Sequence, residues 1–409
     1  MGSHVEETEF RGTPFNPCTA PLNLNQKWVA WDVYHVVDVF TEADDELRAI
    51  REAAALIDMS PLAKYEFSGR DSQRFVDYLI TRDASGIEIG QILYTSWCDQ
   101  AGKIVSDGMV FRIDEDRFRI TGDPCLHWLE TASQGFDVQI EDVTHRLAIA
   151  SLQGPRSREV LEAAAGGDWS DLRFSRIRTS KIASVEVEVA RQGFTGERGY
   201  EICVAGENAV PVWDGLMTAG RDFGIRPAGR VAADVARIEA GLIIPGPDYT
   251  KGGVSDERGS AIQVDEENKT SPYEVGLGRF VDLGKKTFLG KEALQEEARG
   301  GSSQGMVGLL IDWQDVAALF TEQSLPPVVV PTAQWYPSPA IREGRRVGRA
   351  TSIVWSPSAN SLVGFGFLER RFCEPGSTVS VEFHAKGKNG LARAIVTELP
   401  FLRRRRRTV

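Results

Sequence analysis

Helical and strand patterns alternate irregularly along this chain, and that irregularity constrains its fold more than any other feature. Alternating polar and apolar residues, which predict strands, occur at Lys64–Ser68, Ile92–Trp97, Gly108–Ile113, Arg117–Thr121, Val185–Ala190 and Glu201–Val204. Apolar residues at helical spacing cover Gln73–Leu79, Arg156–Ala164, Pro211–Ala219 and Arg230–Ala240. Because the strands recur as hairpin-like pairs, the pattern favours an α+β fold with antiparallel sheets over a doubly wound parallel sheet.

The N-terminal region predicts an arm followed by a helix. Residues 5–27 are rich in Pro, Asn and Thr, which favours irregular structure, and we take 1–40 as an N-terminal arm. Thr41 fits a helix N-cap, with Asp44 at the capping-box position. Apolar residues at helical spacing then predict a helix of about four turns that ends near Asp58.

The C-terminal region predicts a separate, strand-rich domain. Glu297–Gly305 is the best linker candidate, so we place one region at 41–300 and another at 301–409. Short strands separated by Pro and Gly then follow at Met306–Ile311, Ser352–Trp355, Ser377–Phe383 and Ala392–Val396. Before the linker, the polar stretch at 246–271 is long for a loop, and we interpret it as a lid or a subunit contact.

Charge and composition exclude several classes of protein. The chain holds 47 Lys and Arg against 58 Asp and Glu; without the run Arg403–Arg407 the balance is 42 against 58, or −16. A chain with this excess of negative charge is poorly suited to bind nucleic acid. Five dispersed cysteines and five dispersed histidines predict neither a disulfide framework nor a metal site. No apolar run is long enough to span a membrane, so we expect a cytoplasmic protein.

Eight sequence blocks, in order, carry a resemblance to a known family. They are Ile57–Leu62, Tyr94–Thr95, Gly102–Phe111, Leu152–Pro155, Gly193–Glu201 (GFTGERGYE), Arg237–Gly241, Ser271–Leu277 and Phe288–Leu294. Together they resemble the glycine-cleavage T-protein (aminomethyltransferase) superfamily over roughly residues 40–400. The resemblance implies a three-lobed, cloverleaf-like α+β fold, with a central folate channel and a C-terminal β-barrel. It also implies an enzyme that moves a one-carbon unit onto tetrahydrofolate.

The resemblance implies particular site residues. Asp107 matches the family's active-site aspartate, and Glu201 matches the glutamate that binds the pteridine ring. Tyr94 and Phe194 match aromatic positions along the folate, and we add Val110 and Arg237 as further cofactor-binding candidates. A carboxylate can accept two adjacent N–H groups of a pterin edge, and a second carboxylate can stabilise positive charge during carbon transfer.

Local sequence alone leaves simpler interpretations open for three of these positions. Asp107 follows a glycine-containing turn, Glu201 lies in an alternating strand with a solvated face, and Arg237 could pair with Glu239 on a helix surface.

Two departures from the family bear on the donor. Ala233 stands where the aminomethyltransferases proper carry an arginine, and Pro61 replaces a usual histidine. Loss of that fixed cation argues against an aminomethyl group carried on a lipoylated protein. We therefore expect a small-molecule donor, as in the superfamily's tetrahydrofolate-dependent demethylases, and favour an aromatic methyl ether or methylenedioxy compound. No lipoyl carrier is expected, and the chain could be a monomer or a homodimer.

The donor pocket has its own candidates. Trp28–His35 holds two Trp, a Tyr and a His, which could form an aromatic pocket or simply N-terminal core. An aryl ether must expel a phenolate, so Tyr34 or His35 could act as the general acid. Trp31, Trp97 and Leu62 complete the predicted substrate contacts, with Trp97 in the same wall as Tyr94.

The predicted reaction is direct attack by N5 of tetrahydrofolate on the donor carbon, with Asp107 positioning the folate. Three alternatives stand beside it. The chain could be a true aminomethyltransferase, or an N- or S-demethylase for dimethylglycine- or sulfonium-type donors. A folate-binding iron–sulfur maintenance protein is disfavoured, because Phe288–Glu292 lacks the cysteine of that group's motif. The Arg403–Arg407 run could be a solvated tail or could reach the folate glutamate.

Overall fold

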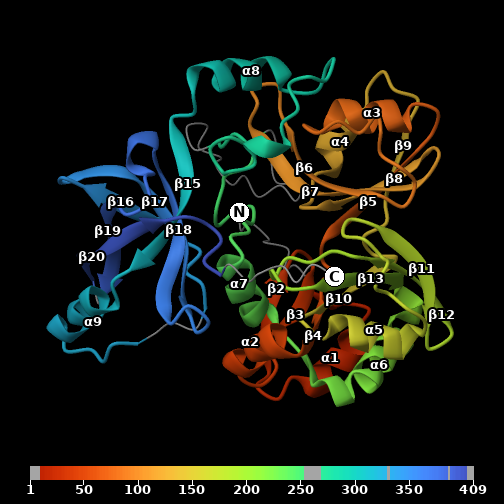
Figure 1. Ribbon diagram of the computed structural model, residues 1–409, viewed down its shortest axis with the longest axis horizontal. Coiled ribbons are helices and arrows are strands. Elements are labelled where there is room, and N and C mark those ends of the chain that lie inside the picture. The colour runs from red at the N-terminus through yellow and green to blue at the C-terminus, as the bar shows by residue number, and fades with distance from the viewer. Residues whose placement is uncertain (1–9, 253–268, 329–331, 386, 403–409) are drawn as a thin grey trace, which may run out of the picture. The chain divides into compact units, whose positions relative to one another are not determined.

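The computed structural model describes residues 10–252, 269–328, 332–385 and 387–402 (Figure 1). The chain forms two compact units, each built from two separate stretches of sequence. Unit 1 comprises residues 1–63 and 143–236, and unit 2 comprises residues 64–142 and 237–409. Both mix helices with antiparallel sheets, so the predicted α+β class is confirmed.

Unit 1 contains two sheets. The smaller has the order β1-β3-β2 and the larger has the order β11-β12-β13-β10-β4-β14. Its strands are β1 (Arg11–Gly12), β2 (Lys27–Trp31), β3 (Tyr34–Val39), β4 (Ala54–Asp58), β10 (Leu147–Gln153), β11 (Ile177–Ile182), β12 (Val185–Ala190), β13 (Gly199–Ala205) and β14 (Ile225–Pro227). Its helices are α1 (Asn16–Leu22), α2 (Ala43–Glu52), α5 (Ser157–Ala165), α6 (Ala209–Ala219) and α7 (Arg230–Glu239), whose last three residues fall in unit 2.

Three predictions for unit 1 are wrong. The supposedly irregular segment 5–27 contains β1 and α1 within its described part. The predicted long helix ends at Glu52, and Ala54–Asp58 forms a strand between β10 and β14. A strand buried inside a sheet is apolar on both faces, so its sequence resembles a buried helix. Thr41 is not the cap; instead the Glu46 carboxylate accepts hydrogen bonds from the Phe40 and Thr41 amides.

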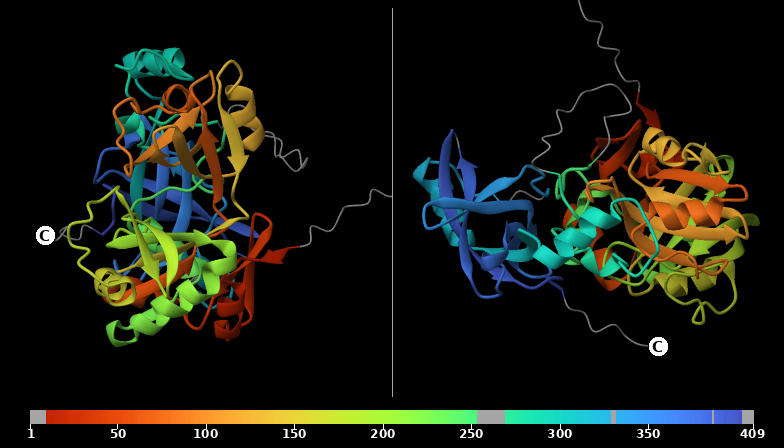
Figure 2. Two further views of the ribbon diagram at one scale, coloured as in Figure 1. Left: turned by 90° about the vertical axis from the view of Figure 1, so that its right-hand side faces the viewer. Right: turned by 90° about the horizontal axis from the view of Figure 1, so that it is seen from above.

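Unit 2 contains a five-stranded sheet of order β6-β7-β8-β5-β9 and a closed barrel of order β15-β18-β17-β16-β19-β20 (Figures 1 and 2). The sheet strands are β5 (Ala63–Ser68), β6 (Ile92–Cys98), β7 (Ile104–Asp114), β8 (Arg117–Gly122) and β9 (Gln139–Asp142), with α3 (Ser72–Leu79) and α4 (Leu126–Ala132) beside β8 and β9. The barrel strands are β15 (Gln304–Ile311), β16 (Ser338–Arg342), β17 (Arg345–Ser356), β18 (Ser361–Glu369), β19 (Thr378–Ala385) and β20 (Lys388–Thr397). Helices α8 (Lys291–Gly300) and α9 (Trp313–Glu322) flank β15 in the sequence.

The barrel confirms the prediction of a strand-rich C-terminal region. The predicted linker Glu297–Gly305 is too long, because its first four residues end α8 and its last two begin β15. Every strand and helix predicted between Lys64 and Ala240 is present within a few residues of its expected bounds. Most of the polar stretch 246–271, from 253 to 268, lies outside the described residues, as does the Arg403–Arg407 run.

Candidate active site

Asp107 lies on β7, at the centre of a three-residue cluster in unit 2. Its carboxylate accepts a hydrogen bond from the Tyr94 hydroxyl at 2.6 Å on Oδ2, and another from the Tyr249 hydroxyl on Oδ1. A carboxylate has about four acceptor positions, so each oxygen can accept one further donor. The cluster therefore presents a negative group that two phenols orient and that a ligand N–H could still reach.

The cluster has perturbed electrostatics. Burial raises the pKa of Asp107 to about 6, although the two tyrosine hydrogen bonds oppose the rise, and Asp123 adds to it. Burial and then the Asp107 charge raise the pKa of both Tyr94 and Tyr249 well above 10. Both phenols therefore stay protonated near neutral pH and act as donors. A carboxylate with a pKa near neutrality is suited to exchanging protons with a substrate.

Strand alternation explains which side chains join Asp107. On β6 and β7, Tyr94 pairs with Met109 and Ser96 pairs with Asp107, so these four side chains share one face. Gly108 allows close packing of β8, because a Cβ there would lie 1.9 Å from the Thr121 carbonyl oxygen. Met109 is partly exposed on the Asp107 face and was missed by sequence reasoning, although the period of two could have revealed it.

Two predicted contacts are wrong for the same reason. Trp97 and Val110 lie on the opposite face of the sheet from Asp107, and both are fully buried. Trp97 therefore does not form a wall with Tyr94, and Val110 belongs to the core of unit 2. Each differs from a residue on the Asp107 face by an odd number of positions along its strand, which reverses the direction of the side chain.

Tyr249 is the site residue that sequence reasoning missed entirely, and a buried network holds the segment that carries it. The adjacent Asp248 is fully buried, and its carboxylate accepts four hydrogen bonds. The donors are Arg237 at 2.6 Å, the Ile244 amide at 2.9 Å, Thr351 at 2.7 Å and Ser352 at 2.6 Å. Since Thr351 and Ser352 lie on β17, the barrel anchors the residue next to Tyr249.

This network also accounts for Arg237. Its side chain is 1% exposed, and besides Asp248 it donates to the Ser352 hydroxyl at 2.8 Å and to the Leu242 carbonyl. Glu239 is fully buried and accepts a hydrogen bond from Ser356 at 2.5 Å. The alternative of a helix-surface pair between Arg237 and Glu239 is therefore wrong. The guanidinium group of Arg237 binds groups of the protein itself, so we do not propose Arg237 as a cofactor ligand.

Glu201 lies in unit 1, on β13, and its side chain is partly buried. Burial alone raises the pKa of this carboxyl to about 7. Within the described residues, Glu201 has no hydrogen-bond or ion-pair partner. A buried carboxylate without donors is costly, and such a group is relieved by a ligand that supplies N–H donors. The solvated-face interpretation of this strand position therefore does not hold.

The loop before β13 contains Phe194, which is partly buried, and two glycines enclose Gln153, one in this loop and one at the start of β13. A Cβ at Gly193 or at Gly199 would lie 2.2 Å from the Gln153 amide. The Gln153 carbonyl accepts a hydrogen bond from Thr195 at 2.9 Å, and buried Arg51 donates to the Thr195 backbone oxygen at 2.7 Å. The GFTGERGYE block is therefore a tightly fixed loop, which can present Phe194 in a defined orientation.

The predicted donor residues of unit 1 do not form one pocket. Tyr34 and His35 are consecutive on β3, so they face opposite sides. Tyr34 is buried with its hydroxyl 2.6 Å from His145 Nδ1, whereas His35 is exposed and stacks on Phe10. Trp31 pairs with Tyr34 across the hairpin. A single pocket built from all the aromatic residues of Trp28–His35 is therefore wrong.

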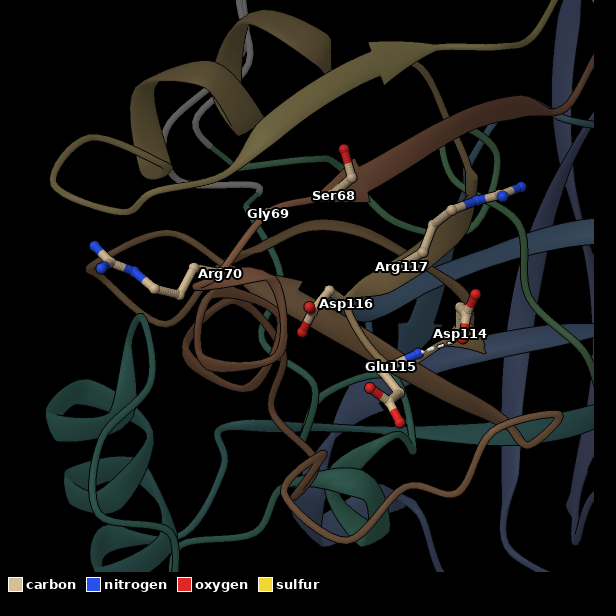
Figure 3. A pocket seen from close by; sticks show the side chains of 7 residues that line it. All are labelled: Ser68, Gly69, Arg70, Asp114, Glu115, Asp116 and Arg117. Carbon is tan, nitrogen blue, oxygen red and sulfur yellow. Dashed lines mark hydrogen bonds between the residues drawn. The ribbon is translucent and has the colours of Figure 1, made fainter.

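Two hollows open elsewhere on the units, and Leu62 lines neither of them. One, of about 630 Å³ in unit 1, is lined in part by Tyr34, His145 and Arg11. The other, of about 560 Å³ in unit 2, lies at the turn between β7 and β8 (Figure 3). Asp114 lines it and stands seven residues beyond Asp107 on the same strand, roughly 23 Å away. Leu62 is partly buried just after β4, and its contact with the substrate stays a prediction.

Across the described ranges, no group of three or more His, Cys, Asp or Glu side chains is arranged to hold a metal ion. In that same part of the chain, no helix is both long and apolar enough to cross a membrane.

The chain belongs to the glycine-cleavage T-protein family, a family of folate-dependent one-carbon transferases. Residues 20–285, more than half of the chain, match the GCVT N-terminal domain, and residues 329–402 match the glycine cleavage T-protein C-terminal barrel domain. The resemblance inferred from the eight sequence blocks is thereby confirmed.

The similarity to known proteins extends over most of the chain. The aminomethyltransferase of Desulfitobacterium hafniense strain DCB-2 is 29% identical over 84% of this chain and 86% of its own length. That of Thermotoga maritima is 28% identical over 93% of this chain and 95% of its own. The crystal structure of aminomethyltransferase T from Bartonella henselae superposes with a TM-score of 0.78 at 24% identity, covering 96% of this chain and 98% of that one. This last likeness confirms the T-protein fold.

Proposed function

We propose that this protein transfers a one-carbon unit from a small-molecule donor to tetrahydrofolate, with Asp107 as the catalytic residue. The observation that carries the proposal is the Tyr94–Asp107–Tyr249 cluster. It supplies a partly buried carboxylate with a pKa of about 6, fixed by two protonated phenols. Tetrahydrofolate supplies the nucleophilic amine that accepts the carbon. Asp107 can orient that amine and accept its proton once the new bond has formed.

The unpartnered carboxylate of Glu201 supports folate as the acceptor. A pterin edge offers adjacent N–H groups, and Glu201 lacks such donors within the described part of unit 1. Binding would satisfy a buried charge, which makes the interaction stronger than one formed in water. Phe194, on the fixed loop just before β13, could stack on an aromatic part of the ligand.

We propose an aromatic methyl ether or methylenedioxy compound as the donor. An aryl ether releases a phenolate that needs a proton, and the hydroxyls of Tyr94 and Tyr249 are proton donors at the Asp107 carboxylate. Tyr249 thus replaces Tyr34 and His35 in the proposed role of general acid. The leaving oxygen gains a proton from a tyrosine, Asp107 takes one from the amine, and Asp107 then returns that proton to the tyrosine through their hydrogen bond, so the reaction is balanced in protons.

A second candidate is glycine-cleavage aminomethyl transfer, which is favoured by the names of the similar proteins. Against it stands Ala233, a buried alanine on α7 where those enzymes are expected to carry an arginine. The purified protein should be incubated with tetrahydrofolate and a donor panel: methoxy- and methylenedioxy-aromatics, dimethylglycine, a sulfonium compound and an aminomethylated lipoyl carrier. Formation of 5-methyl- or 5,10-methylenetetrahydrofolate from an aromatic donor supports the proposal. Turnover with the carrier alone would refute it in favour of the second candidate.

A further inference from the structure

Two arginines lie over one aromatic ring beside the Asp107 cluster. The guanidinium carbons of Arg82 and Arg279 lie 5.4 Å and 4.7 Å from the centroid of the Phe280 ring. Phe280 in turn meets the Tyr94 ring edge-on at 5.2 Å between centroids. The two cations therefore lie one aromatic ring away from the tyrosine that contacts Asp107.

Neither arginine has a carboxylate partner among the described residues. Arg82 is partly buried and makes one hydrogen bond, from Nη1 to the Tyr94 carbonyl at 3.1 Å, out of five possible donors. Burial without a counter-ion lowers the pKa of Arg82. Arg279 is exposed, and its charge opposes the rise in the pKa of the Tyr94 hydroxyl, which indicates that its field reaches the cluster.

The neighbouring charges are already engaged elsewhere. Asp83 accepts hydrogen bonds from the amide and hydroxyl of Ser85, and Asp282 accepts one from the Gly284 amide. The buried ammonium of Lys285 contacts Asp77 and three backbone carbonyls. In a chain of net charge −11, two guanidinium groups without acidic partners beside a catalytic carboxylate call for an external anion.

We propose that Arg82 and Arg279 form a carboxylate-binding site that anchors a ligand whose reacting atom lies at Asp107. The inference rests on the proposed function and deepens it by naming the ligand chemistry. Guanidinium groups bind carboxylates through paired N–H donors, and each of these two also lies over the Phe280 ring, which leaves its N–H edge to face a ligand. The carboxylate can come from the glutamate of tetrahydrofolate or from an acidic aromatic donor.

The test measures binding directly by calorimetry, so it needs no turnover. The probes are two matched pairs: tetrahydrofolate against tetrahydropteroate, which lacks the glutamate, and a methoxybenzoate against its amide. Arg279→Gln is the main variant, because an exposed side chain without a hydrogen bond among described residues can be replaced without unfolding the protein. Arg82→Gln is the second, and Arg74→Gln is the matched control, since Arg74 also lies over a phenylalanine, Phe136, but pairs with Asp71.

We expect Kd to rise roughly 10- to 100-fold for the carboxylate member of one pair only, with its neutral partner unaffected. A rise for tetrahydrofolate assigns the site to the cofactor tail, and a rise for methoxybenzoate assigns it to the donor. Unchanged Kd values in both pairs, or equal losses for both members of a pair, would overturn the inference. Asp107→Asn should keep the carboxylate-dependent binding, so failure of the proposed reaction can be told apart from failure of this site.

Discussion

The phenolic hydroxyl of Tyr249 donates a hydrogen bond to the carboxylate of Asp107, although 142 residues separate the two in the chain. Asp107 comes from the five-stranded sheet of unit 2, whereas Tyr249 follows a segment anchored to the barrel of the same unit. The proposed chemistry therefore depends on a contact between two substructures. A substitution in either the sheet or the barrel should therefore change the pKa of Asp107.

Asp107→Asn should stabilise the protein at neutral pH. The folded-state pKa of about 6 lies above the ordinary value of 3.8, so folding binds a proton that the unfolded chain releases. Stability is therefore lost as pH rises from about 4 to about 6, and the whole cost is present above pH 6. Removing the charge should recover up to about 3 kcal/mol at pH 7.5 and nothing below pH 4. Denaturant unfolding at both pH values checks this, and equal effects at the two would contradict it.

Tyr249→Phe should move the acid limb of the pH–rate profile to higher pH. The tyrosine donates to the charged form of Asp107 and so lowers its pKa; without that donor, the pKa rises above about 6. Turnover through ionised Asp107 then needs a more alkaline solution. Titration of the Asp107 carboxyl carbon by NMR gives the same quantity without catalysis. A profile that stays at the wild-type position would show that Tyr249 does not tune this group.

Asp248→Asn should raise the pKa of Asp107 in the same direction as Tyr249→Phe, because it loosens the segment that positions the tyrosine. We expect turnover to fall on the order of 100-fold, with little further loss in the double variant. Ser352→Ala is a milder version, since it removes one of the four hydrogen bonds. Glu369→Gln is the control, because it breaks an exposed Arg345 pair on the same barrel. If the losses of turnover in Asp248→Asn and Tyr249→Phe were additive in the double variant, Asp248 would not act through Tyr249.

Glu201→Gln should weaken tetrahydrofolate binding roughly 10- to 100-fold, because a neutral amide cannot accept two charge-assisted hydrogen bonds. The same variant should melt at a higher temperature above pH 7, since the buried charge is removed. A higher melting temperature combined with weaker binding separates loss of a ligand contact from misfolding. Glu186→Gln, on the exposed part of β12, should change neither property. Unaltered folate affinity in Glu201→Gln would remove this residue from the site.

Part of the fold follows from sequence pattern, because some strands are amphipathic. β13, β19 and β20 alternate buried with more exposed positions over much of their length, and periodicity locates them. β4 does not, since it is buried on both sides between two other strands and resembles the helix before it. A pattern of apolar residues reports burial, and tertiary pairing decides which element provides that burial.

The site was only partly predictable for a related reason. Asp107, Glu201 and Tyr94 lie in blocks whose residues resemble a family, so they could be named. Tyr249 lies outside the named strands and helices, in a segment without periodicity, and the Asp248 network anchors the residue beside it. Trp97 and Val110 lie close to the site in sequence but on the other face of the sheet, because side chains alternate along a strand.

The central claim is tested most directly by following the carbon itself. A methoxy-aromatic acid labelled with ¹³C at the methyl group is incubated with tetrahydrofolate and excess enzyme, and the products are resolved by NMR. We predict 5-[¹³C]methyltetrahydrofolate and the free phenol in equal amounts, with the rate reduced at least about 100-fold in Asp107→Asn. Label that stays on the aromatic compound while a lipoyl-bound aminomethyl group is consumed would contradict the account, as would undiminished transfer by Asp107→Asn.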